Sequence, residues 1–366
     1  MGSAALAHLA RRGKRAIGFE RFSPAHAMGS SHGGSRIIRQ AYFLDPAYVP
    51  LVQRADELWR DLERDGEPLL RRSGGLMLGA QDSQVVAGST RSAVEHDLPH
   101  ELLDAPQLRK RFPAMRFRDG EVALYEPSAG YLFPEACILA HLRRAVEAGA
   151  EARFGTAVTR WESDGDRVTL KLAGAEWIEA GALVIAAGAW FAQVAPALGL
   201  PLQIERNVMH WFAARGNQAE LEALPVYIVM RDEGRIYGFP YVPGQGTKLA
   251  FYHSFDYTTA DSVDRRVAGA GTEPVRDYLA GLIPDAAGPH LRSAACLYTL
   301  TPDEHFVIGL HPRYSNVAVA GGFSGHGYKF CSVVGEIMSD LIVDGATRHP
   351  IATFDPQRFA PSSQHV

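Results

Sequence analysis

The segment NVAVAGGFSGHGYKFCSVVGEIMSDLIVDG, residues 316–345, joins a short apolar run, a cluster of glycines and a longer apolar repeat. The short run is typical of a buried strand, and the glycines predict a turn. Apolar side chains then recur on one face of a helix, and these are Phe330, Val333, Val334, Ile337, Met338, Leu341 and Ile342. Gly345 is placed to end that helix. The segment therefore predicts a strand, a glycine turn and a helix.

Two similar pieces lie at the start and in the middle of the chain. Residues 2–12 are apolar at helical spacing and end before Gly13, and residues 16–19 form a short apolar run. Residues 183–200 begin LVIAAGAW and predict a buried parallel strand, a turn and a helix. Pro196 argues against reading this stretch as a membrane span. We therefore expect a nucleotide-binding α/β fold assembled from distant parts of the chain.

The first piece carries half of a dinucleotide-binding fingerprint. In that fingerprint, glycines let the backbone approach a pyrophosphate at a helix N-terminus, and an acidic residue after the second strand binds ribose hydroxyls. Gly2 fits the third glycine and Glu20 fits the acid. An ordinary αβ unit, or a site for NAD, explains this half-motif as well.

The strand and the first two glycines of that fingerprint are not in the sequence. A central strand would supply roughly half a dozen apolar residues, each contributing about 1.5 to 3 kcal/mol when buried. Domains of this kind are stable by only about 5 to 15 kcal/mol. We therefore expect the natural protein to start upstream of Met1 with a strand and a glycine turn.

Composition limits the partners that the protein can have. The 37 lysines and arginines and 41 aspartates and glutamates are spread along the chain, for a net charge of −4, so we expect no nucleic-acid or membrane partner. The three cysteines form no CxxC or zinc pattern, which favours a reducing cytoplasm. His253, His305 and His326 lack metal-ligand spacing, so we expect no metal site.

Four segments together carry a family resemblance. They are AACLYTLTPDEHFVIGLHPRYSNVAVAGGFSGHGYKF (residues 294–330), GSSHGGSRIIRQAY (29–42), IYGFP (236–240) and LVIAAGAW (183–190). They occur in the same order and at matching spacings in monomeric sarcosine oxidase and N-methyltryptophan oxidase, and the chain resembles this family from Gly2 to about Phe354. The family binds FAD covalently through a cysteine, so FAD is the implied cofactor.

The resemblance implies an α/β (α+β) fold with two discontinuous domains, similar to D-amino-acid oxidase and glutathione reductase. The FAD-binding, Rossmann-like domain would comprise residues 1–72, 135–202 and 291–366. The substrate domain, built on an antiparallel sheet, would comprise residues 73–134 and 203–290, which the sequence predicts as short strands and turns. Helices are expected at 48–62 and 134–149, and a hairpin with an Asp-Gly turn at 156–172.

The resemblance also implies the residues that bind the flavin. Cys296 matches the cysteine that forms a thioether with the 8α-methyl carbon of FAD, although a buried cysteine can also be a small hydrophobe. The other implied cofactor-binding residues are Gly2, Glu20, Ser30, Ser35, Arg36, Val158, Gly188, Gly325, Gly327 and Lys329.

The implied catalytic residues are Lys248, Arg36, His32 and Tyr237. Lys248 matches the lysine that activates O2, since a fixed cation stabilises the charge formed as electrons reach oxygen. The implied substrate-binding residues are Arg39, Lys329, Tyr298 and Gly325. An Arg/Lys pair suits a carboxylate because Arg grips it bidentately and Lys adds a point charge. A surface role for Lys248 and core packing for the tyrosines remain alternatives.

The implied reaction oxidises the secondary amine of an N-methyl amino acid, such as sarcosine, to an imine that water hydrolyses to an amino acid and formaldehyde, while O2 becomes H2O2. We expect a monomer with a carboxylated amine and O2 as its partners. Phe43, Leu44 and Asp45 stand where sarcosine oxidases have a Gly-Glu-Gly turn, and Ile228 replaces a methionine. N-methyltryptophan, pipecolate and similar substrates therefore stay open, as do a dehydrogenase and a flavin-free scaffold.

Overall fold

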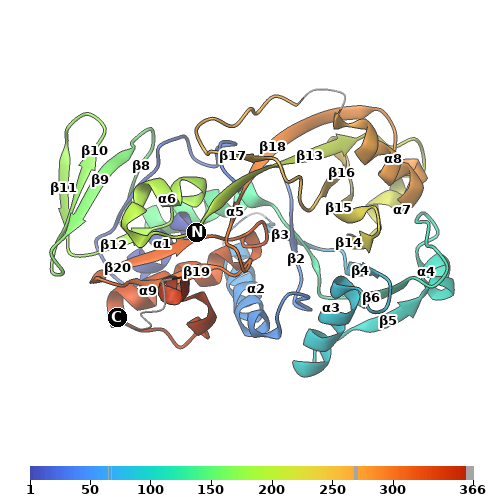
Figure 1. The fold of residues 1–366 in the computed structure, drawn as a ribbon, viewed down its shortest axis with the longest axis horizontal. Coiled ribbons are helices and arrows are strands. Elements are labelled where there is room, and N and C mark those ends of the chain that lie inside the picture. The colour runs from blue at the N-terminus through green and yellow to red at the C-terminus, as the bar shows by residue number, and fades with distance from the viewer. Residues whose placement is uncertain (65, 67, 268–270, 360–366) are drawn as a thin grey trace, which may run out of the picture.

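A helix from the start of the chain and a helix from residues 331–344 lie side by side in the left half of the molecule (Figure 1). The structure is a computed structural model and describes residues 1–64, 66, 68–267 and 271–359. Helix α1 (Gly2–Arg11) packs between α9 (Cys331–Asp344) and α5 (Pro134–Glu147), and α2 (Val49–Glu63) packs on α9. The sequence predicts each of these four helices.

The close approach of α1 and α9 depends on Gly335. A Cβ atom at this position would lie 2.5 Å from the Cβ of Ala4 and 2.6 Å from its carbonyl carbon. The α9 stripe that the sequence predicts is buried except for Ile342, which is half-buried, and Gly345 ends the helix with a positive φ of 73°. The two helices therefore form one rigid layer that fixes where the N-terminus of α1 lies.

Short parallel strands lie beside this helical layer in two separate sheets. Strand β1 (Ile17–Phe19) pairs in parallel with β8 (Glu151–Arg153). Strand β12 (Leu183–Ile185) pairs in parallel with β20 (Tyr314–Gly321), whose other edge pairs with β19 (Val307–His311). The predicted hairpin is present as β9 (Val158–Ser163) and β10 (Val168–Leu172), to which β11 (Trp177–Ala180) adds.

A large, mostly antiparallel sheet forms the other part of the molecule (Figure 1). Its strands, in spatial order, are β17 (Tyr257–Thr258), β13 (Gln203–Phe212), β16 (Gly246–Phe251), β15 (Gly234–Val242), β14 (Val226–Arg231), β4 (Gly75–Gly79), β6 (Val122–Glu126) and β5 (Glu101–Asp104). Strand β18 (His290–Leu300) pairs along its length with β13. The proposed domain boundary at residue 291 thus falls at the start of a strand of this sheet.

The register of the large sheet brings distant residues to one face. Asn207 lies opposite Cys296, Trp211 lies opposite Lys248, and Tyr237 lies opposite both Ala250 and Ile228. Residues directly opposite in antiparallel strands share a face. The other face is covered by α7 (Gln218–Glu222) and α8 (Glu273–Leu282). One face is therefore free to form a site.

Two parts of the sequence prediction are wrong. Residues 73–134 contain the helices α3 (Gln84–Glu95) and α4 (Ala105–Arg111), not only strands and turns. Their caps are Ser83, whose hydroxyl accepts from the N–H of Val86, and a capping box at Asp104. The helix predicted after residue 187 is only the single turn α6 (Phe191–Val194), flanked by 3-10 turns, and it ends shortly before Pro196.

The segment between β1 and α2 is mainly irregular, as expected, but it contains one strand. Strand β2 (Arg36–Ile38) pairs with β7 (Gly130–Leu132), whose other edge pairs with β3 (Leu70–Arg72). This small sheet joins the helical layer to the large sheet. It fixes the backbone of Arg36 and therefore of the predicted site residues on either side of the strand, Ser35 and Arg39.

We predict that Gly335→Ala lowers the free energy of unfolding by about 1 to 3 kcal/mol, because the new methyl group meets the backbone of α1. The matched control is Gly281→Ala in α8, where an added Cβ meets no atom within 4 Å. Gly281→Ala should leave the free energy of unfolding equal to that of wild type or slightly higher, because alanine favours helices. Chemical denaturation of both variants measures the difference, and equal stability of the two would contradict the account.

Candidate active site

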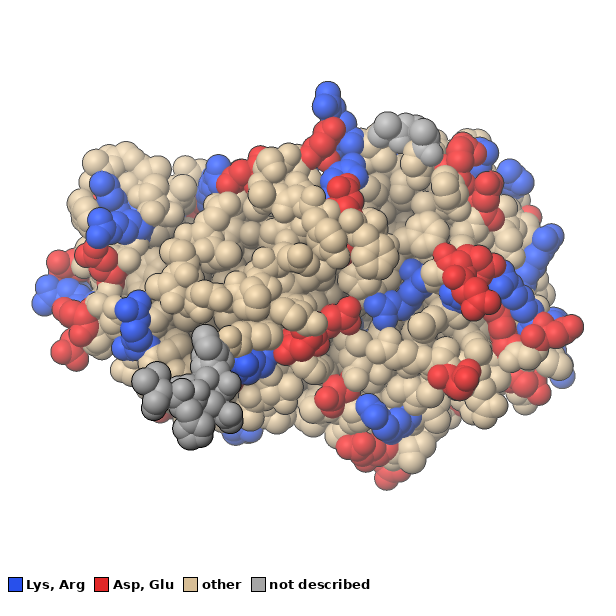
Figure 2. Space-filling view, in the orientation of Figure 1, with Lys and Arg blue, Asp and Glu red and all other residues tan. Residues whose placement is uncertain are grey.

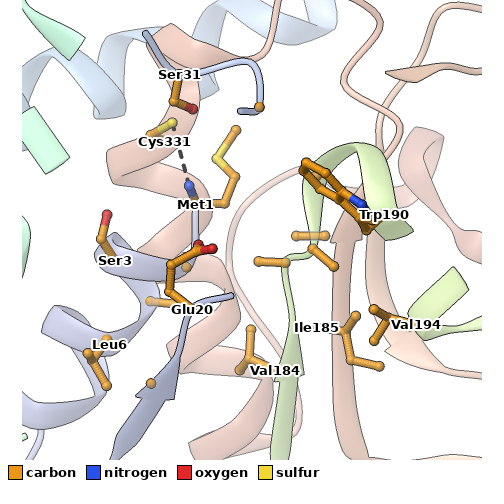
Figure 3. Close-up of a pocket in the computed structure, with 18 of the residues that line it drawn as sticks. Met1, Ser3, Leu6, Glu20, Ser31, Val184, Ile185, Trp190, Val194 and Cys331 are labelled. Atoms are coloured by element: carbon orange, nitrogen blue, oxygen red, sulfur yellow. Dashed lines mark hydrogen bonds between the residues drawn. The ribbon is translucent and has the colours of Figure 1, made fainter. Parts of the chain in front are cut away.

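One large cavity runs between the helical layer and the large sheet. Its volume is about 1650 Å³, larger than the roughly 300 to 1000 Å³ of ordinary small-molecule pockets. It is lined by the start of α1, by β1 and β12, and by residues of β18 such as Cys296. Figure 3 shows the side chains of Val184 and Glu20 on either side of its α1 end. The cavity therefore extends from the helical layer to the large sheet.

The α1 end of the cavity contains the half-fingerprint residues. Gly2, Glu20, Val158 and Gly188 all line the cavity, and Met1 and Glu20 point into it in Figure 3. Burial opposes ionisation of Glu20, but hydrogen bonds from His26 and from the N–H of Phe22 lower its pKa. A negative carboxylate and a helix N-terminus are the groups that bind ribose hydroxyls and a pyrophosphate.

The loop before β2 joins Arg36 to Cys296. The guanidinium of Arg36 donates to the carbonyl of Ser30 at 2.8 Å and lies 3.7 Å from the Cys296 sulfur. The Ser30 hydroxyl donates to the carbonyl of Leu297, next to the cysteine. Cys296, Ser30 and Arg36 all line the cavity. The loop therefore holds the guanidinium of Arg36 and the sulfur of Cys296 next to each other at the cavity wall.

Lys248 lies directly behind this loop. Its ammonium donates to the carbonyls of Gly33 and Ser35, at 3.0 and 2.7 Å, and to the Ser35 hydroxyl at 3.1 Å. Burial, reinforced by Arg36, lowers the pKa of Lys248 well below its usual range. Lys248 and Ser35 are not among the residues that line the cavity. The loop therefore lies between the charge of Lys248 and the cavity. The three N–H groups of Lys248 already donate to atoms of this loop, so none is left for a ligand.

His32 also lies outside the cavity lining, in the same loop. Burial, reinforced by Arg36, lowers its pKa to about 4, so the imidazole is neutral at ordinary pH. Its Nε2 has no hydrogen-bond partner among the described residues. The carboxylate of Glu135 accepts from the N–H groups of Gly33 and Gly34 and holds the loop in place. The sequence analysis missed Glu135.

Arg39 and Lys329 both line the cavity, and both cationic groups lie near the ring of Tyr42. Arg39 is 3% exposed, stacks over the rings of Tyr42 and Phe43, and uses one amino group on the carbonyl of Ala41. Lys329 donates to the carbonyl of His326 at 2.8 Å. Burial, and then Arg39, lowers the pKa of Lys329 well below its usual range. A carboxylate ligand would relieve this repulsion between two basic groups.

The carboxylate of Glu126, which acts on Arg39, already accepts hydrogen bonds from backbone N–H groups. Glu126 is fully buried and acts on Arg39 electrostatically, but its carboxylate accepts from the N–H groups of Gln40 and Ala41 and from the Ser128 hydroxyl. It fixes the turn that carries Arg39. The Nε of Arg39 has no partner among the described residues. That donor is available to a ligand.

Aromatic side chains wall the middle of the cavity. Tyr237 and Tyr298 hydrogen-bond to each other, and burial raises the pKa of both hydroxyls. Gly325 has a φ of 77°, and a Cβ there would lie 2.6 Å from the Tyr298 ring, so the turn requires glycine. Gly327 is likewise crowded by Phe323. Both glycines line the cavity beside Lys329.

The two departures from the family pattern differ in position. Phe43 and Ile228 line the cavity, whereas Leu44 does not. Of the residues that replace the Gly-Glu-Gly turn, Phe43 is therefore the one placed to contact a ligand.

The histidines considered as metal ligands have other partners. His326 lies between the Tyr42 hydroxyl and the carbonyl of Glu304, and His305 contacts the Tyr48 hydroxyl. Within the described ranges, no group of three or more His, Cys, Asp or Glu side chains is placed to hold a metal ion.

His253 forms an ion-pair cluster that the sequence did not predict. Its Nδ1 lies 2.8 Å from the fully buried Glu205 of β13, and its Nε2 lies 3.4 Å from Glu304, in the loop between β18 and β19. Burial opposes the charge, but the hydrogen bonds to both carboxylates raise the pKa of His253 to about 9. The cluster ties the large sheet to the turn that holds His326 and the cavity wall.

Comparison with known families identifies the protein class. The family model for "FAD dependent oxidoreductase" matches residues 1–341. The chain belongs to this family. Monomeric sarcosine oxidase from Streptomyces avermitilis is 48% identical over 98% of the chain and 95% of that protein. N-methyl-L-tryptophan oxidase from Salmonella arizonae is 35% identical over 98% and 96%. The resemblance to this group is therefore confirmed.

Solved structures confirm the fold. Glycine oxidase from Geobacillus kaustophilus superposes with a TM-score of 0.82 at 22% identity, covering 98% of this chain and 96% of that one. NikD, described as an unusual amino acid oxidase essential for nikkomycin biosynthesis, gives 0.86 at 22% identity over 99% and 96%. The mixed α/β fold with an antiparallel sheet is the one that the sequence analysis expected.

The protein is thus an FAD-dependent amine oxidoreductase that acts on a small-molecule amine with O2. The cavity fits FAD, because a helix N-terminus and Glu20 lie at one end and the thiol of Cys296 lies beside Arg36 at the other. Among the helices described, none has the length and apolar character to cross a membrane. Figure 2 shows basic and acidic side chains interspersed over one face of the molecule.

The His253 cluster predicts a pH-dependent stability. Because its pKa in the fold is raised from 6.5 to about 9, the cluster stabilises the fold fully below about pH 6.5, and this stabilisation is lost as pH rises through about 9. Thermal unfolding midpoints of wild type should fall over this range relative to those of His253→Gln. The control is His290→Gln, at an exposed histidine that has no carboxylate partner among the described residues. Parallel pH profiles for all three proteins would refute the prediction.

Proposed function

We propose that the protein oxidises the secondary amine of an N-methyl amino acid, with sarcosine as the simplest substrate. The amine would lose a hydride equivalent and a proton to give an imine, which water hydrolyses to an amino acid and formaldehyde. The relatives named above support this substrate class. The observation that carries it is the pair of buried basic groups, Arg39 and Lys329, at one end of the cavity.

Arg39 and Lys329 would hold the carboxylate of the substrate. Arg39 still has its Nε free among the described residues, and Lys329 uses one proton on the His326 carbonyl. Fixing the carboxylate orients the methylamine group toward Tyr237, Tyr298 and Gly325, which line the adjacent part of the cavity. The positive surroundings also favour the neutral, oxidisable form of the amine over its ammonium form.

Bound FAD would accept the hydride equivalent and pass the electrons to O2, giving H2O2. Arg36, in the loop of residues 30–36, and Lys248, behind that loop, would supply a positive field where negative charge develops. We propose that the neutral His32 of the same loop acts beside them. We also propose that Gly2, Glu20, Val158 and Gly188 bind the nucleotide part, and that Ser30, Ser35, Gly325 and Gly327 shape the flavin end.

We further propose the two discontinuous domains given above, and a monomer in the cytoplasm. The contacts of α1 with α9 and α5 support the discontinuous FAD-binding domain, since they join segments from the start, middle and end of the chain into one layer.

The substrate assignment is tested with purified, flavin-loaded protein. Sarcosine, N-methyltryptophan, other N-methyl amino acids and pipecolate are each assayed for peroxide and aldehyde release in air. We expect equimolar peroxide and formaldehyde from sarcosine. Turnover without peroxide would indicate a dehydrogenase, and selective turnover of pipecolate would replace the proposed substrate.

Arg39→Met should lower kcat/KM for the preferred amine about tenfold to a hundredfold, because a charge-assisted hydrogen bond is lost. The matched control is Arg91→Met, at an exposed arginine on α3. Steady-state oxygen uptake measures both. Unchanged kinetics in Arg39→Met would contradict the proposed carboxylate site.

We propose that Cys296 is joined to FAD through an 8α thioether. The exposed fraction of Cys296 is only 3%, yet it lines the cavity beside Arg36, which supports a sulfur placed to meet a ligand. Wild type should stay yellow after acid precipitation, whereas Cys296→Ser should release its flavin. Cys331→Ser is the control, because Cys331 is also buried and lines the cavity, and it should keep the flavin. Flavin release from wild type would overturn the linkage.

A further inference from the structure

Two polar atoms of cavity-lining side chains have no hydrogen-bond partner among the described residues. They are the Nε of Arg39 and the hydroxyl of Tyr252. Buried polar groups nearly always have a partner, so unpartnered atoms on two side chains that line one cavity call for an explanation, and a ligand supplies one. The sequence analysis gave no role to Tyr252.

Tyr252 is held rigidly just beyond the end of β16. Its ring packs under the guanidinium of Arg235, whose central carbon is 3.6 Å from the ring centroid. Its N–H donates to the carbonyl of Arg235 at 2.7 Å, and its carbonyl accepts from the side chain of Asn207 at 2.9 Å. The ring is 6% exposed. The hydroxyl therefore has a fixed position and cannot turn out to water.

The hydroxyl of Tyr252 can act as a donor. Burial raises its pKa to about 12, against a smaller opposite effect of Arg235, so the phenol is neutral at ordinary pH. The nearest phenols of the wall, Tyr237 and Tyr298, are already bonded to each other. Arg39 and Tyr252 both line the cavity, and contacts through Phe43 and Arg235 connect them.

We propose that the hydroxyl of Tyr252 donates a hydrogen bond to the carboxylate of the amine substrate, as a third donor beside Arg39 and Lys329. This inference rests on the proposed function. A carboxylate has about four lone-pair sites, so Arg39 and Lys329 leave room for a further donor. A bond from Tyr252 to the amine nitrogen would instead tie up the electron pair that oxidation requires.

Arg235 would act as a positioning residue for this contact. Besides its stacking on Tyr252, its guanidinium lies 5.4 Å from the centroid of the Phe43 ring. Phe43 in turn packs on Arg39. The four side chains thus form one stack that fixes Arg39 and Tyr252 relative to each other.

The test measures equilibrium binding of methoxyacetate to flavin-loaded enzyme by titration calorimetry. Methoxyacetate has the size and carboxylate of sarcosine, but it has no amine to oxidise. Tyr252→Phe should weaken its binding about tenfold to a hundredfold, as expected for loss of a hydrogen bond to a charged group. The variant keeps the ring and removes an orphan polar atom, so the fold should be retained.

The matched control is Tyr227→Phe. Tyr227 is also buried with an unpartnered hydroxyl, but it does not line the cavity. Its variant should bind methoxyacetate as wild type does. Binding by Tyr252→Phe within twofold of wild type, or equal weakening in both variants, would overturn the proposal.

A third comparison separates this inference from the proposed function. If wild type binds methoxyacetate and Arg39→Met does not, the carboxylate site stands, and only the Tyr252 result decides the present proposal. If wild type and Arg39→Met show the same lack of binding, the carboxylate site itself fails, and the role of Tyr252 falls with it.

Discussion

Four basic side chains, Arg36, Arg39, Lys248 and Lys329, are held inside the protein around one cavity, and this is the constraint on which the rest of the structure depends. Taking such groups out of water costs several kcal/mol each unless they find partners. Here the partners are mostly backbone carbonyls, for example those of Ser35 for Lys248 and Ala41 for Arg39. Carbonyls solvate the charge but do not neutralise it. An anionic ligand is the natural complement.

The backbone around the cavity is built to present those carbonyls. Carboxylates take up the N–H groups of the same loops, the half-buried Glu135 at Gly33 and the buried Glu126 at Gln40, so that the carbonyls stay directed at the basic groups. Glycine is required at Gly325 because the chain turns against Tyr298. The loop geometry, the charge and the aromatic wall are therefore one arrangement, and they fit a carboxylated amine beside a flavin.

Several features of the fold could be predicted from the sequence because they depend on neighbours along the chain. The helices around residues 2–12, 48–62 and 331–344 follow from apolar spacing and end signals, and their structure agrees. The helices α3 and α4 were missed because capping by Ser83 and Asp104 outweighs weak apolar patterns. Motif matches alone also predict that Arg39, Lys329 and Cys296 belong to one site.

The sequence by itself determined most of the elements, the family and the residues that the motifs carry. Only the tertiary structure decided which groups remain without partners, and therefore what Tyr252, Arg235, Glu126 and His253 do. The alternation in β16 does put Lys248 and Ala250 on one face, with Tyr252 in phase just beyond the strand. It does not show that the Tyr252 hydroxyl lacks a partner. Hydrogen bonding between groups far apart in sequence depends on how strands and loops from both domains meet, and local pattern carries no information on that meeting.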